Sequence, residues 1–291
     1  MGLNVLSVFD GISCGQIAFE RANIDVDNYF ASEIEMDSIK VTQYNYPNTI
    51  QLGDINDYKQ WKLPQIDILI GGSPCQDLSI AKPNREGLSG SKSNLFYKYV
   101  EVLHEFKPKY FLLENNNSMP KEAKETITSI LGVNPIMINS SLVSAQNRKR
   151  LYWTNISNIE QPKDKNIKLQ DVLVSGNTER EKSLCVTRRY AGFQGSQSYL
   201  RRRYFGKSFG QAVFENTTAE EQKKLWKLDP NKEFETIGKV RPLTPLECER
   251  LQTLPDNYTA CLESKYKRIE CVGNGWTVDV IAHILSGLHI K

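Results

Sequence analysis

The sequence lacks the features that mark membrane, secreted and metal-binding proteins. Its 291 residues contain no apolar run close to the ~20 residues that a membrane-spanning helix needs. The six cysteines show no zinc or redox spacing, and a chain of this length does not depend on disulfide staples. The first residues carry no basic region of the kind that begins a secretory signal. We therefore expect a cytoplasmic protein with reduced thiols, no bound metal and no membrane partner.

The overall charge of the chain does not indicate a type of partner, and the sequence is not repetitive. There are 37 basic and 34 acidic residues, and the net charge of +3 is too small by itself to argue for a polyanionic partner. No internal repeat and no low-complexity tract is present. With 40% hydrophobic residues, the chain is long enough for one sizeable core and a smaller lobe.

Up to about residue 160, short apolar runs alternate with amphipathic ones, which is typical of parallel βαβ units. The expected strands are Asn4–Phe9, Asn28–Ser32, Ile66–Ile70, Tyr110–Leu113, Ile136–Asn139 and Leu151–Thr154. Helices are expected between them, among others at Asp37–Tyr44 and Leu95–Phe106.

A more polar stretch from about 160 to 240 interrupts this rhythm before helix signals return. Thr244-Pro245-Leu246-Glu247 is a capping box with proline at the first helical position. An apolar stripe indicates a last helix and consists of Val278, Ile281, Leu285 and Leu288. We predict an α/β fold with a doubly wound, mostly parallel sheet, in which 1–160 and 240–291 form one domain and 161–239 a smaller lobe.

Polar and glycine residues follow the first three strands in an order that suits a cofactor. Asp10-Gly11-Ile12-Ser13-Cys14-Gly15 leads into a helix, whose first N–H groups are available to a ligand. Glu33 closes the second strand and can bind ribose hydroxyls, and Asp54 can accept from an exocyclic amine. Acids at strand ends are also common as solvated turn or N-cap residues. Taken together, the three features predict an adenosine-bearing cofactor.

A cysteine follows the apolar run Ile66–Ser73 in the triplet Pro74-Cys75-Gln76. A cysteine by itself is more often a small buried hydrophobic residue than a nucleophile. This one follows a buried strand, at the edge where open α/β sheets place their chemistry. Glu114 ends a second strand at the same edge. A thiolate is a strong nucleophile, so Cys75 is a candidate nucleophile with a carboxylate nearby.

Three further motifs complete an ordered set: Gln146-Asn147-Arg148-Lys149-Arg150, Arg241-Pro242-Leu243-Thr244 and Gly273-Asn274-Gly275-Trp276. With the glycine loop, the acid at 33, the Pro-Cys-Gln loop and the Glu-Asn strand end, the chain resembles the cytosine-C5 DNA methyltransferases. Locally it is most similar to the catalytic domain of the de novo enzymes. The resemblance covers roughly 3–156 and 238–290. Asn116 and Gly275 depart from the usual motifs without removing a group that the chemistry needs.

The resemblance implies a Rossmann-like fold that binds S-adenosylmethionine and releases S-adenosylhomocysteine. The residues expected to bind the cofactor are Phe9, Asp10, Gly11, Ile12, Cys14, Gly15, Glu33, Ile34, Asp54, Ile55, Pro74, Asn274 and Trp276. Cys75 is expected to attack C6 of a flipped cytosine, and Glu114 to hydrogen-bond N3. Arg150 would contact the base carbonyl, and Arg148 would support the loop or the sugar-phosphate.

Two segments are candidates for the DNA contact. The polar loop 77–93 contains Ser79 and Lys92, which are expected at phosphates, although an ordinary surface loop has the same composition. Residues 182–214 contain seven basic residues, no acid and seven aromatics. A stretch of one sign inside a near-neutral chain indicates a phosphate footprint, unless it is a solvated face. The candidate contacts there are Thr187, Arg188, Arg189, Arg201, Arg202 and Arg203.

Three other functions compete with a standalone, monomeric DNA methyltransferase of a prokaryote or phage. A catalytically dead DNA-binding regulator would not need Cys75, Glu114 and the arginine run. An RNA cytosine methyltransferase stays open, because the basic, aromatic lobe suits either nucleic acid. An NAD-dependent enzyme would need the Gly-x-Gly-x-x-Gly fingerprint that the loop at 10–15 lacks.

Overall fold

The computed structural model describes residues 2–73, 95–235 and 238–288. The chain divides into two compact units. Unit 1 comprises Met1–Asn139, Lys149–Pro162 and Val278–Lys291, and unit 2 comprises Ser140–Arg148 and Lys163–Thr277. In the described residues, no helix is both long and apolar enough to cross a membrane.

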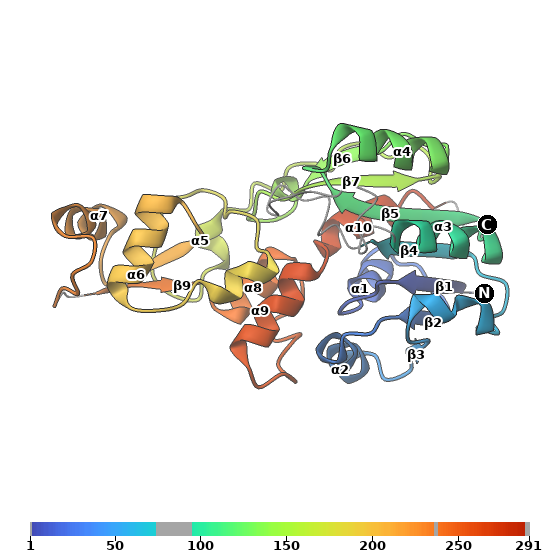
Figure 1. The fold of residues 1–291 in the computed structure, drawn as a ribbon, viewed down its shortest axis with the longest axis horizontal. Helices are drawn as coiled ribbons and strands as arrows, with labels where there is room; N and C mark the ends of the chain where they lie inside the picture. The colour runs from blue at the N-terminus through green and yellow to red at the C-terminus, as the bar shows by residue number, and fades with distance from the viewer. Residues whose placement is uncertain (1, 74–94, 236–237, 289–291) are drawn as a thin grey trace. The chain divides into compact units, whose positions relative to one another are not determined.

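Unit 1 is built on a seven-stranded sheet in the order β3-β2-β1-β4-β5-β7-β6 (Figure 1). The strands are β1 Leu3–Val8, β2 Val26–Ser32, β3 Ile50–Gln51, β4 Ile68–Gly72, β5 Tyr110–Asn116, β6 Ile136–Asn139 and β7 Lys149–Thr154. The first five run parallel, whereas β7 is antiparallel to both β5 and β6. The predicted mostly parallel, doubly wound sheet is therefore confirmed, with strand ends shifted by at most a few residues.

The helices of unit 1 are α1 Cys14–Arg21, α2 Met36–Asn45, α3 Leu95–Phe106, α4 Lys121–Leu131 and α10 Val278–Leu285, with a 3₁₀ turn η1 at Ile55–Gln60. Alternate strand residues and the apolar stripes of α3 and α4 form one core, in which Tyr99 and Trp153 are completely buried. The last helix packs on α1, and Arg21 on α1 forms an ion pair of 2.5 Å with Asp279 on α10. Leu288 was expected on that helix but lies beyond its end, because α10 stops at Leu285.

Unit 2 consists of short elements around a two-stranded antiparallel ribbon. They are η3 Ser140–Leu142, α5 Leu169–Val172, η4 Arg188–Gly192, α6 Gln197–Arg201, the π-helical turn η5 Arg202–Gly206, β8 Ala212–Glu215, α7 Ala219–Leu228, β9 Lys239–Pro242, α8 Pro245–Leu251 and α9 Lys265–Asn274. The predicted capping box begins α8: Thr244 Oγ1 accepts from the Glu247 N–H, and Glu247 accepts from the Thr244 N–H.

The aromatic residues of the lobe form the core of unit 2. Tyr190, Phe193, Tyr204 and Phe214 are all at most 4% exposed. Residues 240–277 belong to the same compact unit, since β9 pairs with β8 and α9 packs on η4. The compact units therefore differ in extent from the domains expected at 1–160 plus 240–291 and at 161–239. Those functional domains remain a prediction.

Candidate active site

The turn after β1 has an unusual backbone. Phe9, Gly11 and Ser13 all have positive φ angles, of 57°, 61° and 55°. For phenylalanine and serine this region is costly, and such residues cluster where a ligand is held. A Cβ placed on Gly11 would meet no atom within 4 Å, so the backbone here faces open space. The turn is thus shaped for the close approach of another molecule.

Asp10 ties this turn to the neighbouring strand. Its carboxylate accepts a hydrogen bond of 2.8 Å from the Tyr29 hydroxyl on β2 and another from the Ser13 hydroxyl. Burial raises the pKa of Asp10 to about 6; the nearby Glu33 charge adds to this shift, and the hydrogen bonds oppose it. A Cβ on Gly15 would lie 2.6 Å from the Tyr29 hydroxyl oxygen. Glycine at 15 therefore makes room for the Tyr29–Asp10 hydrogen bond.

Glu33 is held at the end of β2 by backbone donors. One carboxylate oxygen accepts from the Gly11 N–H at 2.7 Å, and the other accepts from the N–H groups of Ile34 and Glu35 at 2.7 and 2.9 Å. A carboxylate has about four acceptor positions, so ribose hydroxyls can still donate to it. The Ile34 side chain beside it is 65% exposed, an apolar surface next to a polar one. This combination suits the ribose and base of a nucleoside.

The other cofactor candidates of unit 1 differ in what they can offer. Asp54 is the N-cap of η1, where its Oδ1 accepts from the Asn56 N–H at 2.9 Å. Ile12, Cys14 and Ile55 are at most 4% exposed, so they reach a ligand mainly through their backbone. Pro74 lies outside the described residues.

Glu114 and Arg150 form an ion pair at the sheet edge. The Arg150 Nε lies 2.8 Å from Glu114 Oε1, and the two side chains are only 13% and 12% exposed. They are diagonal neighbours, since Glu114 on β5 is opposite Tyr152 of antiparallel β7 and Asn116 is opposite Arg150. The structure thus brings together the acid and one arginine of the predicted catalytic set. Cys75, Ser79 and Lys92 lie outside the described residues.

Asn115, to which the sequence gave no separate role, holds the chain directly before Pro74. It is 1% exposed, and its side-chain amide donates to the Ser73 hydroxyl at 2.9 Å. Side chains alternate across a strand, so Asn115 points away from the face that carries Glu114. This alternation of side chains along a strand is the sequence signal from which the inward direction of Asn115 could have been predicted. Asn115 fixes Ser73, the residue directly before Pro74.

Within unit 2, Arg148 joins two segments that are far apart in sequence. It is 4% exposed and donates to the backbone oxygens of Val186 at 2.8 Å and Gly275 at 2.9 Å. A Cβ on Gly273 would lie 2.4 Å from the Thr187 carbonyl carbon, so only glycine permits this approach. Of the two roles expected for Arg148, the geometry supports the loop-supporting one. The cofactor candidates Asn274 and Trp276 flank Gly275; Asn274 is exposed and Trp276 half-buried.

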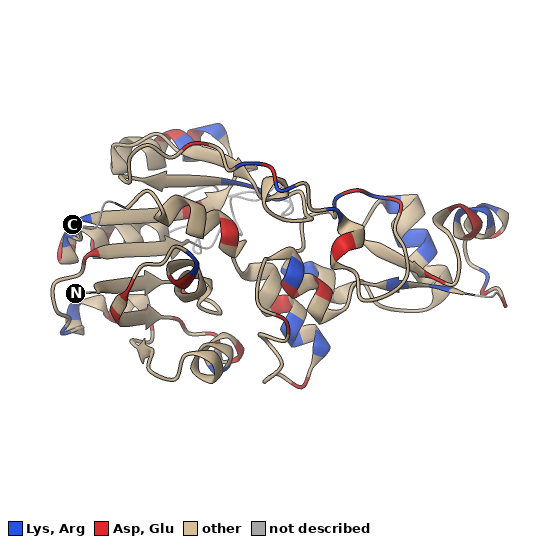
Figure 2. Cartoon of the chain, turned by 180° about the vertical axis from the view of Figure 1, so that it is seen from behind, with Lys and Arg blue, Asp and Glu red and all other residues tan. Residues whose placement is uncertain are grey.

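The basic residues of the lobe are of two kinds, and Figure 2 shows Lys and Arg in blue. Thr187, Arg188, Arg189 and Arg202 are exposed, as surface contacts must be. Arg201 is not, because only 1% of it is exposed and its guanidinium donates to Gln222 at 3.0 Å and to the Lys232 carbonyl at 3.1 Å. The structure thus corrects the expectation of a surface role for Arg201 to an internal one.

Comparison with solved structures places the whole chain in one fold class. The Entamoeba histolytica methyltransferase EhMeth superposes with a TM-score of 0.70 at 17% identity, over 99% of this chain and 98% of that one. The S. pombe Dnmt2 methyltransferase also gives 0.70, at 18% identity, over 98% and 97%. The fold is that of the S-adenosylmethionine-dependent methyltransferases, as predicted.

The family follows from the sequence comparison. The model of the C-5 cytosine-specific DNA methylases matches residues 3–289, and the chain belongs to this family. The type II methyltransferase M.FnuDI of Fusobacterium nucleatum is 28% identical over 98% of this chain and 93% of its own length. The orphan methyltransferase M.SPRI of Bacillus phage SPR is 31% identical over 53% of this chain, and the match spans 38% of that relative. Members of this family use S-adenosylmethionine as methyl donor, which agrees with the predicted cofactor.

Proposed function

We propose that this protein methylates C5 of cytosine within a short duplex DNA sequence, after flipping the base out of the helix. The observation that carries the proposal is the largely shielded Glu114–Arg150 ion pair. Glu114 on β5 is the register partner of Gly72 on parallel β4, and Cys75 follows Gly72 by three positions in the sequence. The acid on β5 and the cation on β7 thus lie at the sheet edge at which β4 ends, three residues before the proposed nucleophile in the sequence.

The residue types match what the reaction requires. C5 of cytosine is a weak nucleophile, so a thiolate of Cys75 first adds to C6 and makes an enamine. Glu114, once protonated, donates to N3 and neutralises the charge that develops there. Arg150 donates to the base carbonyl; once C5 has taken the methyl group, a base, which we take to be water, removes the C5 proton and Cys75 leaves. S-adenosylmethionine supplies the methyl group.

The cofactor contacts are proposed on the same basis. Glu33 would accept from the ribose hydroxyls and Asp54 from the adenine amine, with Ile34 against the ring. The open backbone at Gly11 would receive the methionine part. Phe9, Pro74, Asn274 and Trp276 complete the proposed contacts.

We assign target recognition to the lobe at 161–239 and DNA backbone binding to its exposed basic residues. Arg188, Arg189 and Arg202 are the proposed phosphate contacts, together with Ser79 and Lys92 of the loop before α3. Thr187 would lie near the flipped base.

The test is bisulfite sequencing of DNA from cells that express the protein, with Cys75→Ser as the matched control. We expect 5-methylcytosine in one short sequence context with the unaltered protein and none with the variant. Transfer of labelled methyl groups to duplex DNA and to transfer RNA in parallel separates the DNA enzyme from an RNA enzyme. DNA containing 5-fluorocytosine should form a stable adduct, since fluorine cannot leave C5 as a proton does. Full activity of Cys75→Ser would refute the covalent mechanism.

A further inference from the structure

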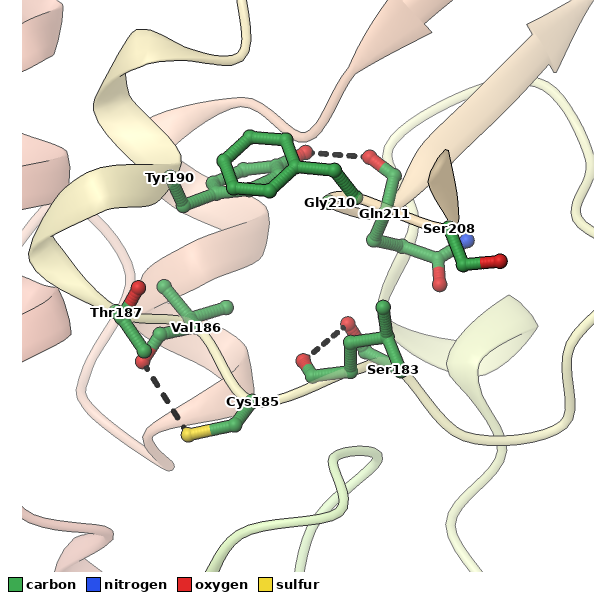
Figure 3. A pocket seen from close by; sticks show the side chains of 10 residues that line it. Ser183, Cys185, Val186, Thr187, Tyr190, Ser208, Gly210 and Gln211 are labelled. Carbon is green, nitrogen blue, oxygen red and sulfur yellow. Dashed lines mark hydrogen bonds between the residues drawn. The ribbon is translucent and has the colours of Figure 1, made fainter. Parts of the chain in front are cut away.

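Unit 2 contains a pocket of about 190 Å³, and of its lining residues the proposed function uses only Thr187 (Figure 3). Its lining comes from three places in the chain: 183–187, Tyr190 and 208–211. One water molecule needs only about 10–15 Å³ of such space. The pocket is therefore large enough for a ring system.

One lining residue, Phe209, is fixed as an aromatic wall. The guanidinium carbon of Arg203 lies 4.2 Å from the centre of its ring, and the ring of Phe193 meets it edge-on at 6.0 Å. Arg203 Nε is buried and has no hydrogen-bond partner among the described residues. The guanidinium group therefore stacks on the aromatic ring, and its Nε–H donates to no acceptor among the described residues.

The backbone that carries Phe209 is strained in a way that favours a ligand site. Ser208 has a positive φ angle of 47°, which is costly for serine, and Gly210 has one of 76°, which glycine adopts freely. A Cβ on Gly210 would lie 2.9 Å from the Phe193 ring, so glycine is required for the close packing here. A π-helical turn at Arg202–Gly206 comes directly before this segment. Such turns and strained residues are concentrated at functional sites.

The charge around the pocket selects an anionic ligand. The stretch 182–214, which supplies every lining residue, contains no acidic residue. Arg188 and Arg189 follow the lining residue Thr187, and Lys207 precedes the lining residue Ser208. All three of these cations are exposed, and Arg188 also forms an ion pair of 3.4 Å with Glu270, which phosphate would have to replace. An aromatic pocket with cations beside it suits a nucleotide, because the ring can stack and the phosphates can be neutralised.

We propose that this pocket receives an unstacked base of the bound DNA other than the target cytosine. Phe209 stacks on that base, and Arg188, Arg189 and Lys207 hold the flanking phosphates. The proposal rests on the proposed function, since it requires the protein to bind and open a DNA duplex. It adds a second contact that contributes to recognition of the target sequence.

The experiment scans the duplex that carries the methylated sequence. 2-Aminopurine replaces each purine in turn and reports unstacking by increased fluorescence, permanganate detects unstacked thymines, and the adduct with 5-fluorocytosine at the target position reports the flipped cytosine. We expect the unaltered protein to unstack one base in addition to the target cytosine. Phe209→Leu should abolish this second signal and weaken DNA binding by roughly 5- to 150-fold, the range for losing a base–aromatic stack.

Two further variants keep the interpretation clear. Leu184→Trp narrows the pocket from a lining position that is 38% exposed, and it should also remove the second signal. Tyr266→Leu removes an aromatic ring that is 46% exposed and does not line the pocket, and it should leave both signals unchanged. If only the target base is unstacked, or if the second signal persists in Phe209→Leu and Leu184→Trp, the pocket proposal is refuted and the proposed function stands. If the target cytosine is neither unstacked nor methylated, the proposed function fails too.

Discussion

Replacing Asp10 by asparagine should change how the stability of the protein depends on pH. In the folded protein the pKa of Asp10 is raised from 3.8 to about 6, chiefly by burial. Because its pKa is raised, Asp10 carries more bound protons in the folded state than in the unfolded state between pH 3.8 and 6. The contribution of Asp10 to stability is therefore fully present below pH 3.8 and is lost as the pH rises through 6. At 1.36 kcal/mol for each pKa unit, the loss is about 3 kcal/mol.

The measurement is urea denaturation of the wild-type protein and of Asp10→Asn, without cofactor, at intervals from pH 4 to 8. Asparagine keeps an acceptor for the Tyr29 hydroxyl and has no proton to lose at these pH values. The other titrating groups are common to both proteins and cancel in the difference. We expect the variant to gain about 2.4 kcal/mol relative to wild type across this range, with most of the gain below pH 6. A difference that does not change with pH would show that Asp10 is not held in a low-dielectric site.

Three further results are expected from the same geometry. Glu33→Ala should weaken S-adenosylmethionine binding by about 1.5–3 kcal/mol in calorimetry, the range for hydrogen bonds to a charged group, and unchanged affinity would place the ribose contact elsewhere. Gly15→Ala should lower the free energy of unfolding by about 1–3 kcal/mol, because its Cβ enters filled space, whereas Gly192→Ala should change it little since nothing lies within 4 Å. Neutralising Arg188 and Arg189 together should reduce the slope of log K against log salt for DNA binding by about 2, and an unchanged slope would mean a solvated face.

The sheet could be predicted from the sequence because its strands are short, continuous apolar runs bounded by polar turns. Such runs are buried on both faces, and their ends place acids such as Glu33 and Glu114 at one edge. The direction of β7 could not be predicted in this way, since an apolar run reads the same in either orientation. The diagonal approach of Arg150 to Glu114 depends on that direction. The resemblance implied that both residues act on the base but not that they form an ion pair, which follows from the antiparallel register.

The lobe was harder to predict because the same residue types build its surface and its interior. Arg201 and Arg202 are adjacent and chemically identical, yet Arg201 faces Gln222 and the Lys232 carbonyl inside unit 2, while Arg202 is exposed. These partners come from 21 and 31 residues further along the chain, so no local pattern indicates them. The aromatic residues have the same ambiguity, and most of them pack with one another.

The hydrogen bonds of Arg148 bear on how such an enzyme acquires a new target sequence. Their acceptors at Val186 and Gly275 are backbone oxygens, and Gly273 approaches the backbone of Thr187. None of these contacts depends on which side chains the segment 186–189 carries. On the proposed DNA contact, substitutions of the exposed residues 187–189 would alter the surface that faces DNA and leave these backbone contacts intact, whereas Val186 is only 2% exposed. Recognition would then diverge between relatives by point mutation, whereas a lobe transplanted without an arginine at 148 and a glycine at 273 would lose its anchor.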